Sequence, residues 1–257
     1  MNPSRPFFSV VILAHNEEES ISRFLRSMAS LNYPSERYEV VVVNNNSTDK
    51  TRELVSRDFP MVRLIDEPRP GVVFARIRGA AEAQGEIIAC TDADCTVPAD
   101  WLAKIADAYN DSSVVAVGGT VQYNERSFIS LIQRLALLVH HQVYYLMTGT
   151  NMSFRMSAYC QCGGFAQGVN FGEDSLISQQ LKKVGRLVIL HGNPVATSLR
   201  RQQSRDGLIY MIKAILFYFT LLVLHRPLRL NLKPASAHKT LKTTTSKQRI
   251  NRFEDPS

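Results

Sequence analysis

The chain has 257 residues, of which 45% are hydrophobic and 21% are charged, as in a globular protein with ample core. Its net charge of +7 is concentrated in residues 226–257, where eight Lys or Arg residues face two acidic ones, so the first 225 residues net only +1. A nucleic-acid-binding domain carries its basic patch on the folded body, so this distribution argues against one and favours a tail near anionic lipid.

The first half of the chain alternates apolar β-type runs with helical patterns. Strands are predicted at 7–13, 38–43, 62–65 and 87–90, and helices at 21–28, 51–56 and 73–83. This order predicts a parallel sheet with helices on both faces. In open sheets of this kind, ligands bind beyond the carboxyl ends of the strands.

Polar clusters directly follow three of these predicted strands. They are Asn16-Glu17, Asn44-Asn45 and Asp92-Ala93-Asp94. Two carboxylates one residue apart repel each other unless positive charge lies between them. Mg²⁺ commonly binds through one or two carboxylates plus substrate phosphates, so the Asp pair suggests a metal–phosphate site. A solvated turn is the plain alternative, since Asp is common in turns.

The second half continues with a helix at 101–109 and a strand at 114–119. An amphipathic helix is predicted at 128–147, packed either in the core or against a membrane. A helix follows from residue 173 to 184, and then an edge-type strand at 186–190.

A second apolar segment lies near the C-terminus. Residues 208–224 contain Lys213 as their only charge, but a membrane-spanning helix needs about 20 residues. An interfacial or re-entrant helix is preferred, with a packed helix as the alternative. The expected organisation is a catalytic-type domain at 1–205, a hydrophobic membrane-associating helix at 206–228 and a disordered basic tail at 229–257.

The cysteines and the N-terminus favour a reducing, cytosolic location. The spacing of Cys90, Cys95, Cys160 and Cys162 fits neither a disulfide framework nor a Cys-x-x-Cys zinc site, so buried free thiols are expected. Residues 1–6 are followed by only a short apolar run, which is unlike a signal peptide.

Seven motifs together resemble the inverting glycosyltransferase family 2. In chain order they are 11–18, 43–51, 71–79, 92–94, 149–155, 163–165 and 172–174. The resemblance covers roughly residues 7–201 and implies the GT-A fold, an α/β, Rossmann-like, mostly parallel sheet flanked by helices. It also implies a divalent metal, Mg²⁺ or Mn²⁺, as cofactor and a nucleotide-sugar donor as partner.

The resemblance assigns roles to particular residues of this chain. Asp174 matches the general base and Asp94 the metal ligand. The nucleotide-binding positions are Ala14, Asn16, Glu17, Asn45, Arg76 and Asp92, and the acceptor side matches Asn151 and Glu173. Without the other motifs Asp174 would be interpreted as a helix N-cap, a common use of Asp.

The chain departs from the family pattern in two places. Asn44 and Asn45 stand where aspartates are usual, which keeps the hydrogen-bonding shape and loses the charge. A late metal-binding His is replaced by a stretch with Arg200 and Arg201, which could pair with the leaving diphosphate. A solvated basic pair is the alternative for these two arginines.

The predicted activity is that of a hexosyltransferase-type enzyme that moves a sugar from a nucleotide-diphosphate sugar, with UDP favoured as nucleotide, to an acceptor hydroxyl with inversion. The apolar segments favour a lipid-linked or saccharide acceptor and peripheral contact with the cytoplasmic face of a membrane, as in glycolipid or polysaccharide synthesis. A non-catalytic, membrane-associated nucleotide-sugar-binding protein is the alternative. A nucleotidyltransferase ranks below it, because residues 14–18 lack a Gly-rich phosphate loop.

Overall fold

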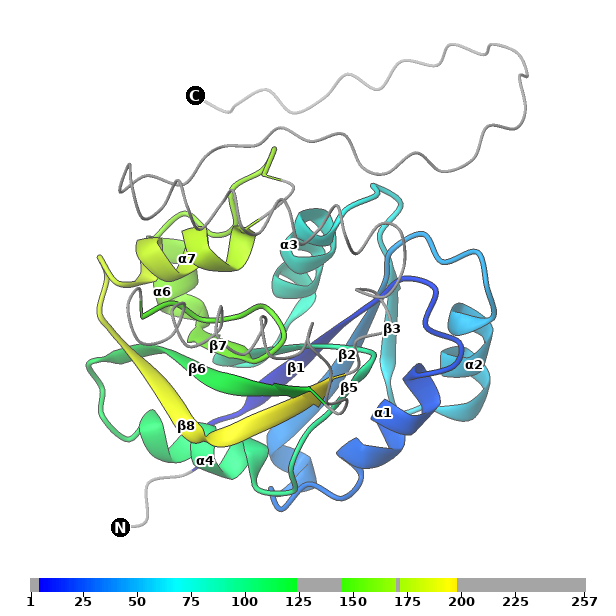
Figure 1. The fold of residues 1–257 in the computed structure, drawn as a ribbon, viewed down its shortest axis with the longest axis horizontal. Helices are drawn as coiled ribbons and strands as arrows, with labels where there is room; N and C mark the ends of the chain where they lie inside the picture. Colours follow the sequence, from blue (N-terminus) through cyan, green and yellow to red (C-terminus); the bar gives the residue numbers. More distant parts are fainter. Residues whose placement is uncertain (1–4, 124–144, 170–171, 198–257) are drawn as a thin grey trace, which may run out of the picture.

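The computed structural model describes residues 5–123, 145–169 and 172–197 (Figure 1). The strands are β1 (Phe8–Ala14), β2 (Tyr38–Asn44), β3 (Arg63–Asp66), β4 (Ile87–Asp92), β5 (Cys95–Thr96), β6 (Val114–Tyr123), β7 (Met152–Arg155) and β8 (Arg186–Thr197). The helices are α1 (Ile21–Met28), the 3₁₀ turn η1 (Ser35–Arg37), α2 (Thr51–Asp58), α3 (Val72–Glu82), α4 (Trp101–Ala108), α6 (Met156–Gln161) and α7 (Glu173–Leu181).

All eight strands form one mixed sheet in the order β3-β2-β1-β4-β7-β6-β8-β5. The first four strands are parallel to one another, as predicted, with Val11 of β1 opposite both Val41 of β2 and Cys90 of β4. β7 runs antiparallel to β4 and β6, whereas β6 and β8 are parallel. The carboxyl ends of β1, β2 and β4 therefore lie at one edge, the expected place for a ligand site.

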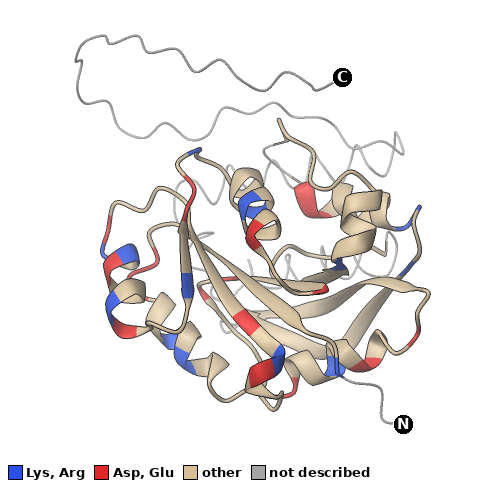
Figure 2. Ribbon diagram, turned by 180° about the vertical axis from the view of Figure 1, so that it is seen from behind, with Lys and Arg blue, Asp and Glu red and all other residues tan. Residues whose placement is uncertain are grey.

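Helices cover both faces of the sheet (Figure 1). Side chains alternate along a strand, so Val10 and Ile12 of β1 pack with α1, α2 and α4, while Val11 and Leu13 pack with α3, α6 and α7. α1 confirms its predicted apolar spacing, because its four apolar residues are all buried. In Figure 2 most of the sheet is tan, and the acidic and basic residues are spread mainly over helices and loops.

Three expectations differ from the structure. The helix predicted at 128–147 does not reach its expected end, since residues 145–147 are not helical and Tyr145 has φ +52°, outside the helical region. The strand predicted at 186–190 is longer than expected, because β8 continues to Thr197; residues 186–190 pair with β6 alone, and only Ala196 and Thr197 also pair with β5. All four cysteines are free, but only Cys90 and Cys95 are buried, while Cys160 is exposed.

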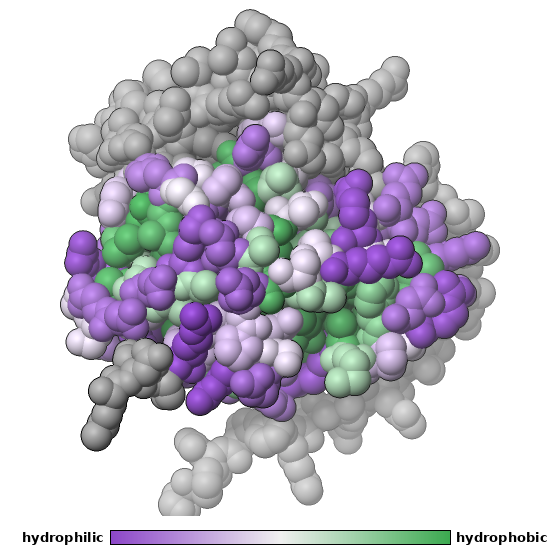
Figure 3. Space-filling model, turned by 90° about the horizontal axis from the view of Figure 1, so that it is seen from below, coloured by the Kyte–Doolittle hydropathy of each residue, from purple (hydrophilic) through white to green (hydrophobic). Residues whose placement is uncertain are grey.

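Parts of the expected organisation lie outside the described residues, namely most of 128–147, the helix at 206–228 and the tail at 229–257. Across the three described stretches, every helix is too short or too polar to cross a bilayer. Seen from below, hydrophilic side chains cover most of the described surface, with smaller hydrophobic patches between them (Figure 3).

Candidate active site

The loops that follow β1 and β2 are bonded to each other. Asn16 has φ +55°, a left-handed conformation that Asn tolerates better than most residues. Its Oδ1 accepts a hydrogen bond from the N–H of Thr48 at 2.8 Å. Glu17 is fully buried, and its N–H donates to Thr51 Oγ1 at 2.8 Å, at the start of α2. Ala14 closes β1, and its carbonyl accepts from the N–H of Asn45. The predicted nucleotide loops are therefore adjacent and held in a fixed relation.

The side chain of Asn45 fastens the end of β2 to the loop before α3. Its Nδ2 donates to the carbonyls of Glu67 and Arg69 at 2.9 and 2.6 Å, and its Oδ1 accepts from the N–H of Gly71 at 2.9 Å. Both amide hydrogens are thus used within the protein. The backbone carbonyl of Asn45 accepts from His15 Nδ1 at 2.7 Å, so that nitrogen carries the proton. Contact between Asn45 and a nucleotide stays a prediction.

Asn44 keeps a buried oxygen without a partner. Its Nδ2 donates to Asp66 Oδ1 at 2.8 Å, while its Oδ1 has no hydrogen-bond donor and the residue is only 6% exposed. This bond, together with Arg52, holds the pKa of the Asp66 carboxyl below its ordinary value despite partial burial. An orphaned acceptor at the carboxyl end of β2 suits a ligand that brings an N–H or O–H donor.

Arg76 of α3 lies among three carboxylates. Its side chain is 3% exposed, its Nε donates to Glu173 Oε1 at 3.3 Å, and its Nη2 lies 3.9 Å from Asp92 Oδ1. The charges of Glu173, Asp92 and Asp174 raise the pKa of the guanidinium even though burial opposes its charge. The structure thus joins residues predicted for the nucleotide side, Arg76 and Asp92, to the Glu173–Asp174 pair.

The Asp174 carboxylate lies in the first turn of α7. Its Oδ1 accepts from the N–H of Ser175 at 2.7 Å, and its Oδ2 accepts from the N–H of Gly149 at 3.0 Å. The N-cap position of α7 is Gly172, so the N-cap interpretation of Asp174 is wrong. Each carboxylate oxygen of Asp174 keeps a second lone pair that can accept a proton. Beside it, burial and then the charge of Asp174 raise the pKa of the Glu173 carboxyl, while Arg76 lowers it.

Asp92 and Asp94 flank the turn between β4 and β5. Asp92 Oδ2 accepts from the hydroxyl of Thr150 at 3.0 Å, and Asp94 is 7% exposed. Burial first, and then the charges of both acids, raise the pKa of the Cys95 thiol well above its ordinary value, which indicates that both carboxylates lie near that sulfur. No group of three His, Cys, Asp or Glu side chains positioned to hold a metal occurs within the described ranges. A divalent ion at Asp94 therefore stays a prediction, and it would take its other ligands from the diphosphate, water or residues elsewhere in the chain.

The side chain of Asn151 is bonded in the interior, between β6, β8 and α4. It is 1% exposed, its Oδ1 accepts from Trp101 Nε1 at 3.0 Å, and its Nδ2 donates to the carbonyls of Thr120 and Asn193 at 2.9 and 2.8 Å. Its side chain thus supports the sheet, and an acceptor contact stays a prediction.

Sequence reasoning did not assign Thr150 to Asp92 or the Gly149 N–H to Asp174. The only available signal was the Thr-Gly-Thr run at 148–150, which lies in a matched motif and suggests a tight turn. Arg200 and Arg201 lie outside the described residues. Thr197, the last described residue before them, pairs with Cys95 of β5, next to Asp94.

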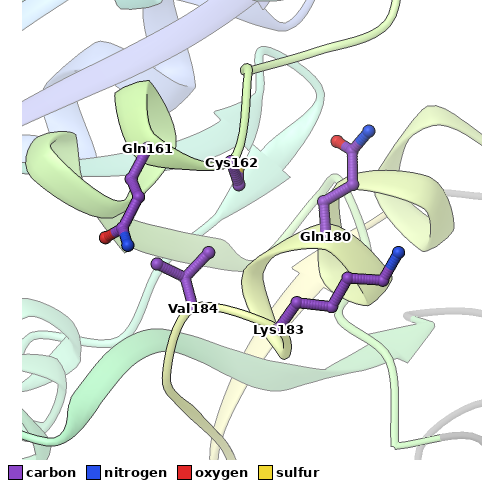
Figure 4. A pocket seen from close by; sticks show the side chains of 5 residues that line it. All are labelled: Gln161, Cys162, Gln180, Lys183 and Val184. Carbon is purple, nitrogen blue, oxygen red and sulfur yellow. The ribbon is translucent and has the colours of Figure 1, made fainter.

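A hollow of about 400 Å³ lies between α6 and the end of α7 (Figure 4). Its lining consists of Gln161, Cys162, Gln180, Lys183 and Val184, and none of these is a predicted site residue. The carboxylate cluster around Arg76, which combines buried charge with strand-end positions, is the stronger candidate for chemistry.

Comparison with known proteins finds similarity to glycosyltransferases. The family model described as "Glycosyl transferase family 2" matches residues 9–166. Glycosyltransferase AglE of Haloferax volcanii is 35% identical over 128 residues, which cover 48% of this chain and 42% of AglE. A beta-monoglucosyldiacylglycerol synthase of Trichormus variabilis is 32% identical over 123 residues, which cover 46% of this chain and 26% of the synthase.

Among solved structures, the mannosyltransferase PcManGT from Pyrobaculum calidifontis, in complex with GDP-Man and Mn²⁺, superposes with a TM-score of 0.71 at 23% identity. The superposition covers 86% of this chain and 65% of PcManGT, which shows a shared fold. The matched part of this chain spans less than half the length of either curated relative.

Proposed function

Since the chain belongs to glycosyl transferase family 2, we propose that it transfers a sugar from a nucleotide-diphosphate sugar to an acceptor hydroxyl with inversion at the anomeric carbon. The observation that carries this proposal is the cluster in which the buried Arg76 lies between Asp92, at the end of β4, and the Glu173–Asp174 pair. A guanidinium at this place brings a strand-end acid and a candidate base into one site.

Asp174 is the proposed general base. Its carboxylate takes the proton of the acceptor hydroxyl while that oxygen forms a bond to the anomeric carbon. The nucleotide diphosphate leaves from the opposite face with the electrons of the broken bond. Base catalysis of this kind typically contributes about 10²- to 10⁴-fold. The Gly149 N–H, bonded to Oδ2, fixes the orientation of the carboxylate.

The donor side comprises the loops after β1 and β2 together with Asp92. Ala14, Asn16, Glu17 and Asn45 are proposed to form the nucleotide pocket. Asp94 would hold a divalent cation, Mg²⁺ or Mn²⁺, which when bound supplies positive charge to the departing diphosphate. Arg200 and Arg201 are proposed to contact the same diphosphate.

UDP is the proposed nucleotide, and GDP is the competitor, because PcManGT is described in complex with GDP-Man. A lipid-linked hydroxyl is the proposed acceptor, supported by the similarity to a beta-monoglucosyldiacylglycerol synthase. Peripheral contact with the cytoplasmic face of a membrane is part of this proposal.

Calorimetric titration of UDP and GDP, with and without Mn²⁺, tests the donor side. We expect Mn²⁺-dependent binding of one nucleotide by the wild type and its loss in Asp94→Ala, while Asp107→Ala, an exposed residue of α4, serves as control. Metal-independent binding would move the diphosphate contact to Arg200 and Arg201. Absence of nucleotide binding by folded protein would contradict the proposal, and binding without sugar transfer to any acceptor would favour the non-catalytic alternative.

A further inference from the structure

We propose that Arg76 is a positioning residue for the base: its guanidinium holds Glu173 and the Gly149 turn, and thereby keeps Asp174 correctly oriented. The inference rests on the proposed function for the role of Asp174 as base. It assigns Arg76 a task on the acceptor side of the site, in addition to the nucleotide contact that the family resemblance implies.

Burial and contacts support this role. The Arg76 side chain is 3% exposed, and its Nε donates to Glu173 across 97 positions of sequence. A buried guanidinium is tolerated only when carboxylates or other acceptors neutralise it. The guanidinium lies 3.3 Å from the Glu173 carboxylate and 3.9 Å from that of Asp92. Of these two acids, Arg76 therefore interacts more closely with Glu173, the residue that precedes the proposed base.

Arg76 also contacts the element that orients the base from the other side. Gly149 lies so close to the guanidinium that a Cβ added there would collide with Nη2. The N–H of the same residue donates to Asp174 Oδ2 at 3.0 Å. Arg76 therefore supports Asp174 through both of its neighbours, Glu173 in sequence and Gly149 in space.

The charges around the pair explain why a cation is needed there. The Glu173 carboxylate faces Arg76 of α3, and the Asp174 carboxylate accepts from the N–H groups of Gly149 and Ser175. The guanidinium of Arg76 also faces Asp92 and Cys90 of β4. Two adjacent, half-buried carboxylates repel each other, and a neighbouring cation stabilises the charged pair. Burial and the charge of Asp174 raise the pKa of Glu173, and the charge of Arg76 is the opposing influence.

The competing interpretation is that Arg76 serves only as a contact for a donor phosphate, which its Nη1, without a hydrogen-bond partner among the described residues, is free to make. The two roles predict different kinetics. A phosphate contact raises the KM for the donor at every pH, whereas a positioning role lowers kcat and moves the acid limb of its pH profile.

The experiment compares wild type, Arg76→Gln, Arg76→Lys, Glu173→Gln and the double variant Arg76→Gln/Glu173→Gln. Arg78→Gln is the matched control, because Arg78 lies on the same helix but is exposed and pairs with Glu82. Release of UDP or GDP from UDP-glucose or GDP-mannose is followed from pH 5 to 9. Proton uptake by the Glu173 carboxyl is followed separately by carbon-13 NMR of Glu-labelled protein.

In Arg76→Gln we expect the Glu173 carboxyl and the acid limb of kcat to shift upward by about one pH unit or more, the range for loss of a neighbouring guanidinium. The rate at pH 6 then falls on the order of tenfold more than the rate at pH 8.5. The double variant removes one positive and one negative charge, so its acid limb should return toward that of wild type. Arg76→Lys should keep it close to wild type.

An unshifted acid limb and carboxyl titration in folded Arg76→Gln, with only the donor KM raised, would overturn the inference. If Arg76→Gln does not fold, Glu173→Gln decides, because loss of the neighbouring charge should move the acid limb to lower pH, and an unchanged limb would overturn the inference. If the wild type releases no nucleotide, the proposed function fails, but the NMR titration still tests the hold of Arg76 on Glu173.

Discussion

At the scale of single residues, Asp174 combines a structural and a proposed chemical task. Asp174→Asn keeps the size of the side chain and one acceptor oxygen for the Gly149 or Ser175 N–H. It removes the basic carboxylate, so we expect sugar transfer to fall by about 10²- to 10⁴-fold with nucleotide affinity unchanged. Initial rates and calorimetry measure the two quantities, with Asp107→Asn as control. Transfer within a few-fold of wild type would contradict the role of base.

Asn45 shows why an amide suits a position where the family usually has an acid. A carboxylate could not donate to the carbonyls of Glu67 and Arg69, as Nδ2 does. Asn45→Ala and Asn45→Asp are both expected to lower the free energy of unfolding by about 2–3 kcal/mol, because buried backbone groups lose their partners. Chemical denaturation measures this, with exposed Asn32→Ala as control. Unchanged stability in both variants would show that the hydrogen bonds from the Asn45 side chain to the 67–71 loop do not contribute to the free energy of unfolding.

At the scale of elements, Asn151 joins α4, β6 and β8 through one side chain. Asn151→Ala leaves the Trp101 indole N–H and the carbonyls of Thr120 and Asn193 without that partner. We expect a loss of about 3 kcal/mol or more in the free energy of unfolding, since each buried polar group left unpaired costs about 1–3 kcal/mol. Thermal and denaturant unfolding measure the effect. A variant with wild-type stability and altered acceptor kinetics would instead support the acceptor role that the family resemblance implies.

The predictability of an element from sequence depended on where its stabilising partners lie. β1 was predictable because parallel strands covered on both faces are continuous apolar runs, and all seven of its residues are buried. β7 has only four residues, including polar Ser153 and Arg155, and lacks the continuous apolar run that predicts a buried strand. It exists because β4 and β6, distant in sequence, pair with it on either side.

The candidate site likewise has features that local sequence predicts and features that depend on distant partners. Polar residues at the ends of parallel strands could be predicted to converge, because the topology of the sheet brings those ends to one edge. The tie between Arg76 and Glu173 spans 97 positions and could not be predicted, because local spacing carries no information on it. Nor could sequence show that Asn151 points into the interior, since a polar residue beside the Thr-Gly-Thr run is equally suited to a ligand contact.

At the scale of the whole molecule, β8 connects the far side of the sheet to the candidate site. Its pairing with β6 shifts between Gly119 and Val121, where Leu190 and Val195 are the successive partners, so residues 191–194 bulge out of the register. Beyond the bulge, Thr197 pairs with Cys95, beside Asp94. The chain therefore leaves the described structure next to the Asp92–Asp94 turn.

The proposed contact of Arg200 and Arg201 with the diphosphate can be tested directly in the full chain. The double variant Arg200→Ala/Arg201→Ala should bind UDP or GDP at least tenfold more weakly, because a hydrogen bond to a charged group contributes about 1.5–3 kcal/mol and about 1.4 kcal/mol is tenfold in affinity. Binding of uridine or guanosine, which lack phosphates, should not change. Arg23→Ala/Arg26→Ala removes the same charge from exposed positions of α1 and controls for net charge. Equal weakening of nucleotide and nucleoside, or equal effects of both double variants, would assign Arg200 and Arg201 to the solvated basic pair that the sequence also allows.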